Sequence, residues 1–164
     1  MQIGLLMVFQ NFEDGISDTE AWARDIELAS LAEPLGFDTL GAVEHHFYNY
    51  AMSPDNLQFL SHMAAKTEKI KLLTGAVILP WNDPLRVAER MIVLDHLSKG
   101  RAIFGVGRGL ARREYDTFHV DMNEARDRFD ESAEMIYNAL ETGVMEGDGK
   151  FYPRERTELR PRPY

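Results

Sequence analysis

A glutamate and two adjacent histidines follow a short apolar run, at the point where a strand is expected to end. The run is Thr39–Val43, and the polar residues are Glu44, His45 and His46. Neighbouring residues on a strand point to opposite faces, so both histidines can face one pocket only if the strand has already stopped. A histidine with its ordinary pKa of about 6.5 suits proton transfer near neutral pH. The sequence therefore raises the question of which histidine does chemistry.

A metal site is one alternative for the two histidines, but their adjacent positions disfavour metal binding. Metal ligands converge on one point, which His-x-His on a strand achieves and His-His does not. The other histidines, His62, His96 and His119, lie on expected helices or in a loop and form no set with a carboxylate at ligand spacing. A histidine in this position often only hydrogen-bonds the loop, and we assign that role to His46. His45 remains the candidate for proton transfer.

Gly75 lies inside an apolar run that reads as a strand. Glycine weakens a strand interior unless a close approach to the backbone requires it. A bulge or tight packing against a helix would explain it structurally. A flat ligand lying on the backbone would explain it functionally, and the residues alone leave both explanations open.

Two arginines are candidates for binding an anion. In the stretch FGVGRGL, Arg108 and Gly109 follow a predicted strand. Leu110 stands where a Rossmann fingerprint would need glycine, so that motif is not supported. Backbone amides and a guanidinium both donate to phosphate, although a solvated basic loop is the simpler reading. Arg126 lies near the expected start of a helix, where an anion is already favoured, but surface arginines are common there too.

The elements that position these residues alternate between strand and helix. We expect strands at about residues 3–9, 39–43, 70–79 and 101–107, each followed by a helix, at about residues 17–35, 53–66, 83–97 and 123–140. The first three helix starts are indicated by a capping box of Ser17 and Glu20, by Ser53 as a cap before Pro54, and by Asp83 as a cap before Pro84. Alternation of this kind implies parallel strands with right-handed crossovers. The loops after the strands are longer than those before them and carry the candidate residues, as at the C-terminal face of a (β/α)8 barrel. A doubly wound open sheet would also fit.

The chain ends differently from the way it begins. Residues 1–145 hold the four strand–helix units, and we expect them to be the N-terminal half of a barrel. In residues 146–164, glycines mark a turn and prolines favour an extended, non-helical backbone. We expect this segment to be a linker toward a second half, with a disordered terminus as the alternative.

Composition limits the classes of partner. The 164 residues are 45% hydrophobic and carry a net charge of −9, which argues against nucleic acid and against an anionic membrane surface. Because the chain has no cysteine, it can form neither a disulfide nor a thiolate site. The first apolar run lacks a basic flank and is too short to span a bilayer, so we expect a soluble cytoplasmic protein.

Four stretches together resemble the bacterial luciferase-like flavin monooxygenases. They are GFDTLGAVEHHF, TGAVILPWNDPLRVAERMIVLDHLSKGR, FGVGRGL and DMNEARDRFDE, and they follow the family's order over nearly the whole chain. The resemblance implies an α/β fold of the (β/α)8 barrel type, with this chain supplying about the first four units. It also implies FMN at the C-terminal face, and family members are longer than this chain.

The resemblance implies a role for each candidate residue. His45 matches the catalytic histidine near the flavin ring, and Gly107 stands where light-emitting members carry a reactive cysteine. Gly75 and Ala76 match a pair joined by a non-prolyl cis peptide against the ring, and the two arginines match phosphate-binding arginines. The residues implied to contact the cofactor are Glu44, Gly75, Ala76, Arg108, Gly109, Leu110 and Arg126.

The implied function is monooxygenation. The family pattern predicts an enzyme that uses reduced FMN and oxygen on an aldehyde or another small organic substrate, with His45 as acid or base. It also predicts a flavin reductase as partner and a homo- or heterodimer. Three alternatives remain: a non-catalytic flavin-binding or truncated remnant, a deazaflavin-dependent reductase of the same barrel type, and a metal-dependent barrel hydrolase.

Overall fold

The computed structural model describes residues 1–12 and 15–164, and these form two compact units. The first comprises Met1–Val77 and Arg101–Gly105, and the second comprises Ile78–Gly100 and Val106–Tyr164. Among the described residues, every helix is too short or too polar to cross a bilayer.

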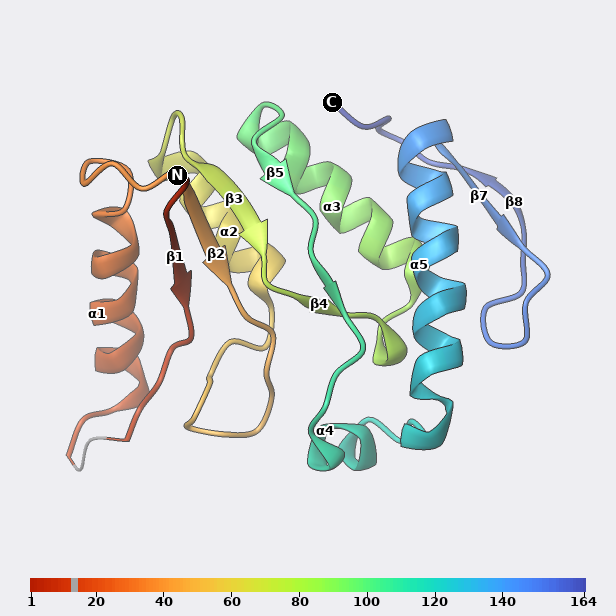
Figure 1. Cartoon of the computed structure of the whole chain (residues 1–164), viewed down its shortest axis with the longest axis horizontal. Coiled ribbons are helices and arrows are strands. Elements are labelled where there is room, and N and C mark those ends of the chain that lie inside the picture. Colours follow the sequence, from red (N-terminus) through yellow and green to blue (C-terminus); the bar gives the residue numbers. More distant parts are fainter. Residues whose placement is uncertain (13–14) are drawn as a thin grey trace. The chain divides into compact units, whose positions relative to one another are not determined.

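The first unit is built on a four-stranded parallel sheet (Figure 1). The strands lie in the order β1 (Gly4–Met7), β2 (Thr39–Ala42), β3 (Lys71–Thr74) and β5 (Ala102–Ile103). All three neighbouring pairs are parallel, so the predicted parallel arrangement is confirmed. Consecutive parallel strands end at the same edge of the sheet, which brings the loops after them together.

Side chains cap the amino ends of the two helices of the first unit. The predicted capping box of Ser17 and Glu20 starts α1 (Asp18–Ser30). The start predicted for the next helix at Ser53 is wrong. Asp55 accepts a hydrogen bond from the backbone of Gln58 and caps α2 (Asn56–Lys66). The Ser53 hydroxyl instead donates to the carbonyl of Val43 at 2.8 Å, which ties the loop back to the end of β2.

The two faces of the sheet differ in burial. Leu40 and Leu72 are fully buried on the face that packs against α2, together with Leu60 and Met63 of that helix. On the other face, the register aligns Leu6 with Gly41 and Leu73. Leu6 is 49% exposed, so helices cover one face of this sheet while its other face keeps exposed apolar side chains.

The third and fourth predicted strands are each interrupted by a glycine. The third stops at Thr74 and resumes as β4 (Val77–Ile78), and the fourth resumes as β6 (Val106–Gly107). The Thr74 hydroxyl both donates to the Gly105 carbonyl and accepts from the Gly105 amide, each at 2.8 Å. A Cβ on Gly105 would lie 2.2 Å from the Thr74 carbonyl oxygen, so only glycine fits at this crossing.

The second unit is mainly helical. Its elements are the 3-10 helix η1 (Leu79–Trp81), α3 (Pro84–Ser98), β6, α4 (Arg112–Thr117), the 3-10 helix η2 (Met122–Glu124), α5 (Ala125–Thr142), β7 (Val144–Gly147) and β8 (Arg154–Glu158). The predicted Asp83 cap with Pro84 at the first helical position starts α3. Helix α5 packs against α3, η1 and β7.

Residues 144–158 form an antiparallel hairpin of β7 and β8 (Figure 1). The segment is turned and extended, as predicted, and it is packed in place. Met145 and Leu159 are buried, and the Glu131 carboxylate accepts hydrogen bonds from the amides of Phe151 and Tyr152. The domain boundary at residue 145 and the linker role of the segment stay predictions.

Glu33 organises the amino-end turn before β3. Its carboxylate accepts hydrogen bonds from three consecutive backbone amides, those of Glu68, Lys69 and Ile70, at 2.7–3.1 Å. Burial raises the pKa of this carboxyl, but the three amides and the nearby Arg101 charge outweigh that effect and hold it below its ordinary value. The charged form is therefore the one that this turn stabilises.

Replacing Glu33 by glutamine should lower the free energy of unfolding by about 1–3 kcal/mol near neutral pH, because a charged acceptor of several amides is lost. Since the pKa is lowered in the folded state, the contribution is complete above about pH 4.5 and is lost as the pH falls through the folded-state pKa. Urea unfolding near neutral pH and below pH 4.5 measures both effects. Glu27→Gln, on the exposed side of α1, is the matched control and should show neither.

Candidate functional site

Glu44 and His46 form a buried pair in the loop that follows β2. The His46 Nε2 lies 3.2 Å from Glu44 Oε1, and their side chains are only 12% and 6% exposed. A pair held this closely positions the loop, which agrees with the structural role predicted for His46. The predicted flavin contact of Glu44 is untested, and this oxygen of its carboxylate is already engaged by His46.

His45 points elsewhere. Its backbone amide donates to the carbonyl of Ser53 at 3.0 Å, and its ring packs edge-on against Tyr50 with 5.4 Å between ring centroids. The side chain lines a pocket of about 470 Å³ at the carboxyl ends of the strands, next to the amino end of α1. Among these three polar residues, His45 is therefore the one that lines this pocket.

The backbone at Gly75–Ala76 is held against the end of β2. The peptide bond between these residues is cis, as the resemblance predicts. The Gly75 amide donates to the carbonyl of Ala42 at 2.8 Å. The buried side-chain amide of Asn56 donates to the carbonyls of Ala42 and Ala76, at 3.2 and 3.0 Å. One side chain at the start of α2 thus links two strand ends.

The surroundings of Gly75 fit a flat group lying on the backbone. A Cβ placed there would meet only the Cδ1 of Leu6 at 3.0 Å and the Ala42 oxygen at 3.8 Å. A Cβ on Gly41 would also meet Leu6, at 3.0 Å. The Leu6 side chain therefore lies against both glycines, with Gly41 buried and the backbone of Gly75 partly exposed. A planar ring could approach the partly exposed backbone at Gly75.

In the second unit, the loop between β6 and α4 is fixed by close packing. Gly109 has a φ of +80°, which favours glycine. A Cβ there would lie 2.8 Å from Ile78 and 2.9 Å from the ring of Trp81. The hydroxyl of the buried Tyr115 donates to the carbonyl of Arg108. This loop is therefore held in one conformation from two sides.

The predicted phosphate ligands lie on the surface of this unit. Arg108 is exposed, and its charge opposes the rise in the Tyr115 pKa that burial causes. Arg126, in the first turn of α5, is 72% exposed, and its Nε donates to Asp130 at 2.9 Å. Leu110 is also exposed. Both arginines can approach an anion from solvent.

The predicted site residues fall into two groups, one in each unit. The first unit holds Glu44, His45, Gly75 and Ala76, and the second holds Arg108, Gly109, Leu110 and Arg126. Sequence reasoning missed the side chains that support both groups, namely Asn56, Thr74 and Tyr115. The asparagine that follows Asp55, a residue type that also suits a helix cap, is the local signal that would have indicated the first of them.

Comparison with known proteins gives a consistent result for the whole chain. The model of the luciferase-like monooxygenase family matches residues 1–164. The alkanal monooxygenase alpha chain of Photorhabdus laumondii is 32% identical over 148 residues, which cover 90% of this chain and 41% of that protein. The chain thus spans less than half the length of this relative.

Solved structures share the fold. Monooxygenase RslO1 from Streptomyces bottropensis is 32% identical, with a TM-score of 0.87 over 99% of this chain and 52% of its own. The oxygenating constituent of 3,6-diketocamphane monooxygenase from Pseudomonas putida, in complex with FMN, has a TM-score of 0.82 at 22% identity, covering 98% and 45%. The coenzyme F420 dependent tetrahydromethanopterin reductase from Methanopyrus kandleri has 0.69 at 26%, covering 98% and 46%. The predicted α/β barrel class, about half of it in this chain, is confirmed.

Replacing Asn56 by alanine should destabilise the chain by about 1–3 kcal/mol, because the buried carbonyls of Ala42 and Ala76 lose a donor. Thermal or urea unfolding measures this change. Gln58→Ala, an exposed position on the same helix, is the control and should change stability little. Equal stability of the Asn56→Ala variant and the parent would show that the link between the strand ends is dispensable.

Proposed function

The chain belongs to the luciferase-like monooxygenase family, and we propose that it supplies the flavin-binding face of an enzyme using reduced FMN and oxygen on an aldehyde or another small organic substrate. The observation that carries this proposal is the partly exposed backbone at Gly75 and Ala76, which bears no side chain larger than a methyl group and is held against the end of β2. His45 follows that strand end by three residues. A ring on Gly75 would then have a titratable side chain nearby.

The first unit would bind and orient the ring. The ring would lie on the partly exposed backbone at Gly75, and the exposed apolar side chain of Leu6 would pack against it and exclude water. When bound, reduced FMN supplies the electrons for oxygen chemistry, and the protein supplies binding and orientation. The Asn56 amide keeps the Ala76 carbonyl turned toward α2, which leaves the opposite side of the peptide for the ring.

Two arginines are the proposed phosphate ligands. The guanidinium groups of Arg108 and Arg126 provide fixed positive charge and several N–H donors, which suit phosphate oxygens. Gly109 and the Tyr115 hydroxyl hold the backbone of the loop that carries Arg108. Arg126 lies in the first turn of α5, where the helix dipole also favours an anion.

His45 would hold or move a proton at an imidazole nitrogen. Its backbone is fixed by the Ser53 carbonyl, and its ring lines a pocket with room for a substrate. The neighbouring His46 is engaged by the Glu44 carboxylate, so its role is to position the loop. We therefore assign the acid–base role to His45 and the supporting role to the Glu44–His46 pair.

Two other functions are weighed against this one. A deazaflavin-dependent reductase is favoured by the similarity to the coenzyme F420 dependent reductase, and it would use the same ring and phosphate positions. A flavin-binding protein without turnover would use the same ring and phosphate positions and would not need an acid or base at His45. Parallel titrations with FMN and with the deazaflavin distinguish the proposed enzyme from the reductase. Oxygen uptake with an aldehyde distinguishes it from a flavin-binding protein without turnover. The predicted dimer, the flavin reductase and the cytoplasmic location belong to this proposal as well.

A branched side chain at Gly75 should block the ring. Gly75→Val should weaken FMN binding at least about tenfold, since overpacking of a tight site costs about 1–3 kcal/mol. Gly75→Ala is the matched control, because its added carbon meets only the flexible end of Leu6 and should leave affinity within a few-fold. Flavin fluorescence titration measures both, and unchanged affinity in the valine variant would place the ring elsewhere.

Removing the imidazole of His45 should affect chemistry more than binding. In the flavin-loaded protein, His45→Ala should reduce monooxygenation by roughly 100-fold or more, the usual scale for a positioned acid or base, with FMN affinity changed only a few-fold. Oxygen uptake and FMN titration give the two readouts. His46→Ala is the comparison: loss of turnover in that variant with normal turnover in His45→Ala would reverse the assignment.

A further inference from the structure

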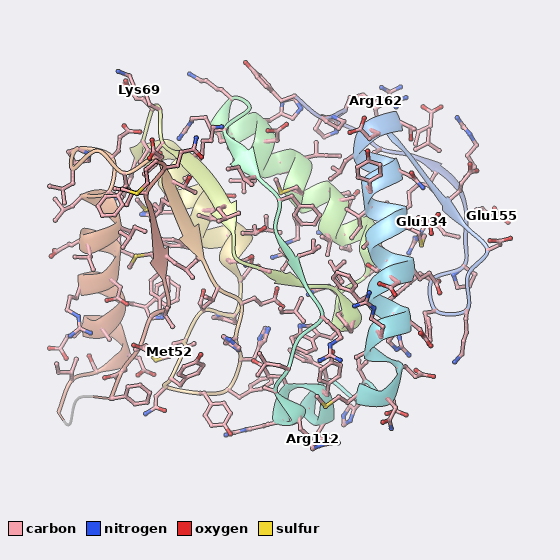
Figure 2. All side chains as sticks on the ribbon, viewed as in Figure 1. Met52, Lys69, Arg112, Glu134, Glu155 and Arg162 are labelled. Atoms are coloured by element: carbon pink, nitrogen blue, oxygen red, sulfur yellow. The ribbon has the colours of Figure 1, made fainter. Side chains whose placement is uncertain are left out.

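The pocket that His45 lines has the size of a small-molecule site. Its volume is about 470 Å³, which is within the range of small-molecule sites. Most of its lining is apolar and comes from Trp22 on α1 and from Phe47, Met52 and Pro54 on the segment between β2 and α2. Figure 2 shows Met52 at the carboxyl ends of the strands and Lys69 at their amino ends.

Backbone hydrogen bonds fix the walls of this pocket. Asn11 is central: its amide donates to the Asn49 carbonyl at 2.8 Å, and its side chain donates to the Asp18 carboxylate at 2.9 Å. These bonds join the loop after β1 to the loop after β2 and to the first turn of α1. The Met52 amide donates to the carbonyl of Phe9 at 2.9 Å. These hydrogen bonds therefore hold the loops that line the pocket in place.

An aromatic stack fixes one wall. Trp22 lies parallel to the buried Phe9, with 4.1 Å between ring centroids and 23° between planes. Phe9 in turn packs edge-on against Phe59 of α2. Because Phe9 is almost fully buried, stacking on it favours one orientation of the Trp22 ring. Trp22 thus presents an aromatic ring to the pocket.

We propose that this pocket binds a neutral cyclic organic molecule, with the ring against Trp22 and the polar group toward His45. Stacked aromatic walls favour a flat or compact ring. The Asp18 carboxylate at the pocket disfavours an anion, because its charge would repel a second carboxylate. Identification of this molecule as the substrate of the enzyme rests on the proposed function, whereas binding of the ring does not.

A neighbouring cavity suggests a different ligand, a long alkyl chain. It has a volume of about 210 Å³, lies between α1 and α2, and shares Trp22 and Pro54 with the first pocket. His62 and Gln58 line only this second cavity. A long alkyl chain would fill both cavities, whereas a compact ring would fill the first alone. The two ligands are therefore distinguished by their sensitivity to His62.

The test uses the neutral bicyclic ketone 1-indanone, titrated into the chain without flavin by calorimetry. We expect saturable binding that is weakened at least about tenfold by Asn49→Trp, because an indole from this exposed position fills the pocket without entering the core. His62→Ala is the matched control and should leave the affinity within about twofold. The anion indane-1-carboxylate should bind more weakly than the ketone and recover affinity in Asp18→Asn.

Several results would overturn the proposal. They are absence of indanone binding, unchanged affinity in a folded Asn49→Trp variant, or equal weakening by His62→Ala. Tighter binding of 2-octanone that depends on His62 would establish an alkyl-chain site instead. The flavin titration is independent of these arms. If indanone binds and FMN does not, the proposed enzyme is rejected and the pocket proposal stands. If FMN binds and indanone does not, the pocket proposal is rejected and the proposed enzyme stands.

Discussion

The loops that carry the candidate residues depend on hydrogen bonds to the backbone groups at the carboxyl ends of the parallel strands. A sheet that stops leaves carbonyls without ladder partners, and a buried carbonyl without a donor is costly. Here side chains supply the donors: Asn56 serves Ala42 and Ala76, Ser53 serves Val43, and Thr74 pairs with Gly105. Each of these bonds also fixes a loop that carries a candidate residue. The structural requirement and the functional geometry are therefore met by the same contacts.

Local signals made much of the fold predictable. The Ser17–Glu20 box and the Asp83–Pro84 start depend on residues within one helical turn, so both were recoverable from sequence. The start of α2 was missed because Ser53 and Asp55 both suit a cap, and only the distant carbonyl of Val43 decides which one caps. Local patterns carry no information about a partner elsewhere in the chain.

The same limit explains the parts of the site that were missed. Glycine at position 75 could be noticed, but its bond to β2 and the Asn56 link join residues 14 to 33 positions apart. Strand β8 was predicted only as extended, because its sequence RERTE has no apolar alternation. It pairs with β7, and burial of the following Leu159 helps to fix it. The conformation of β8 is therefore determined by contacts with distant residues and not by its own amino-acid composition.

Glu33 determines whether an external anion can bind at the amino end of the first sheet. Three consecutive amides in a concave turn are a ready receptor for an external oxyanion. In this chain the receptor is filled from within, by a carboxylate that is covalently part of the protein and is held beside Arg101. A soluble phosphate would have to displace a tethered competitor whose effective concentration is very high. The amino-end turn is therefore closed to external anions by a carboxylate of the same chain.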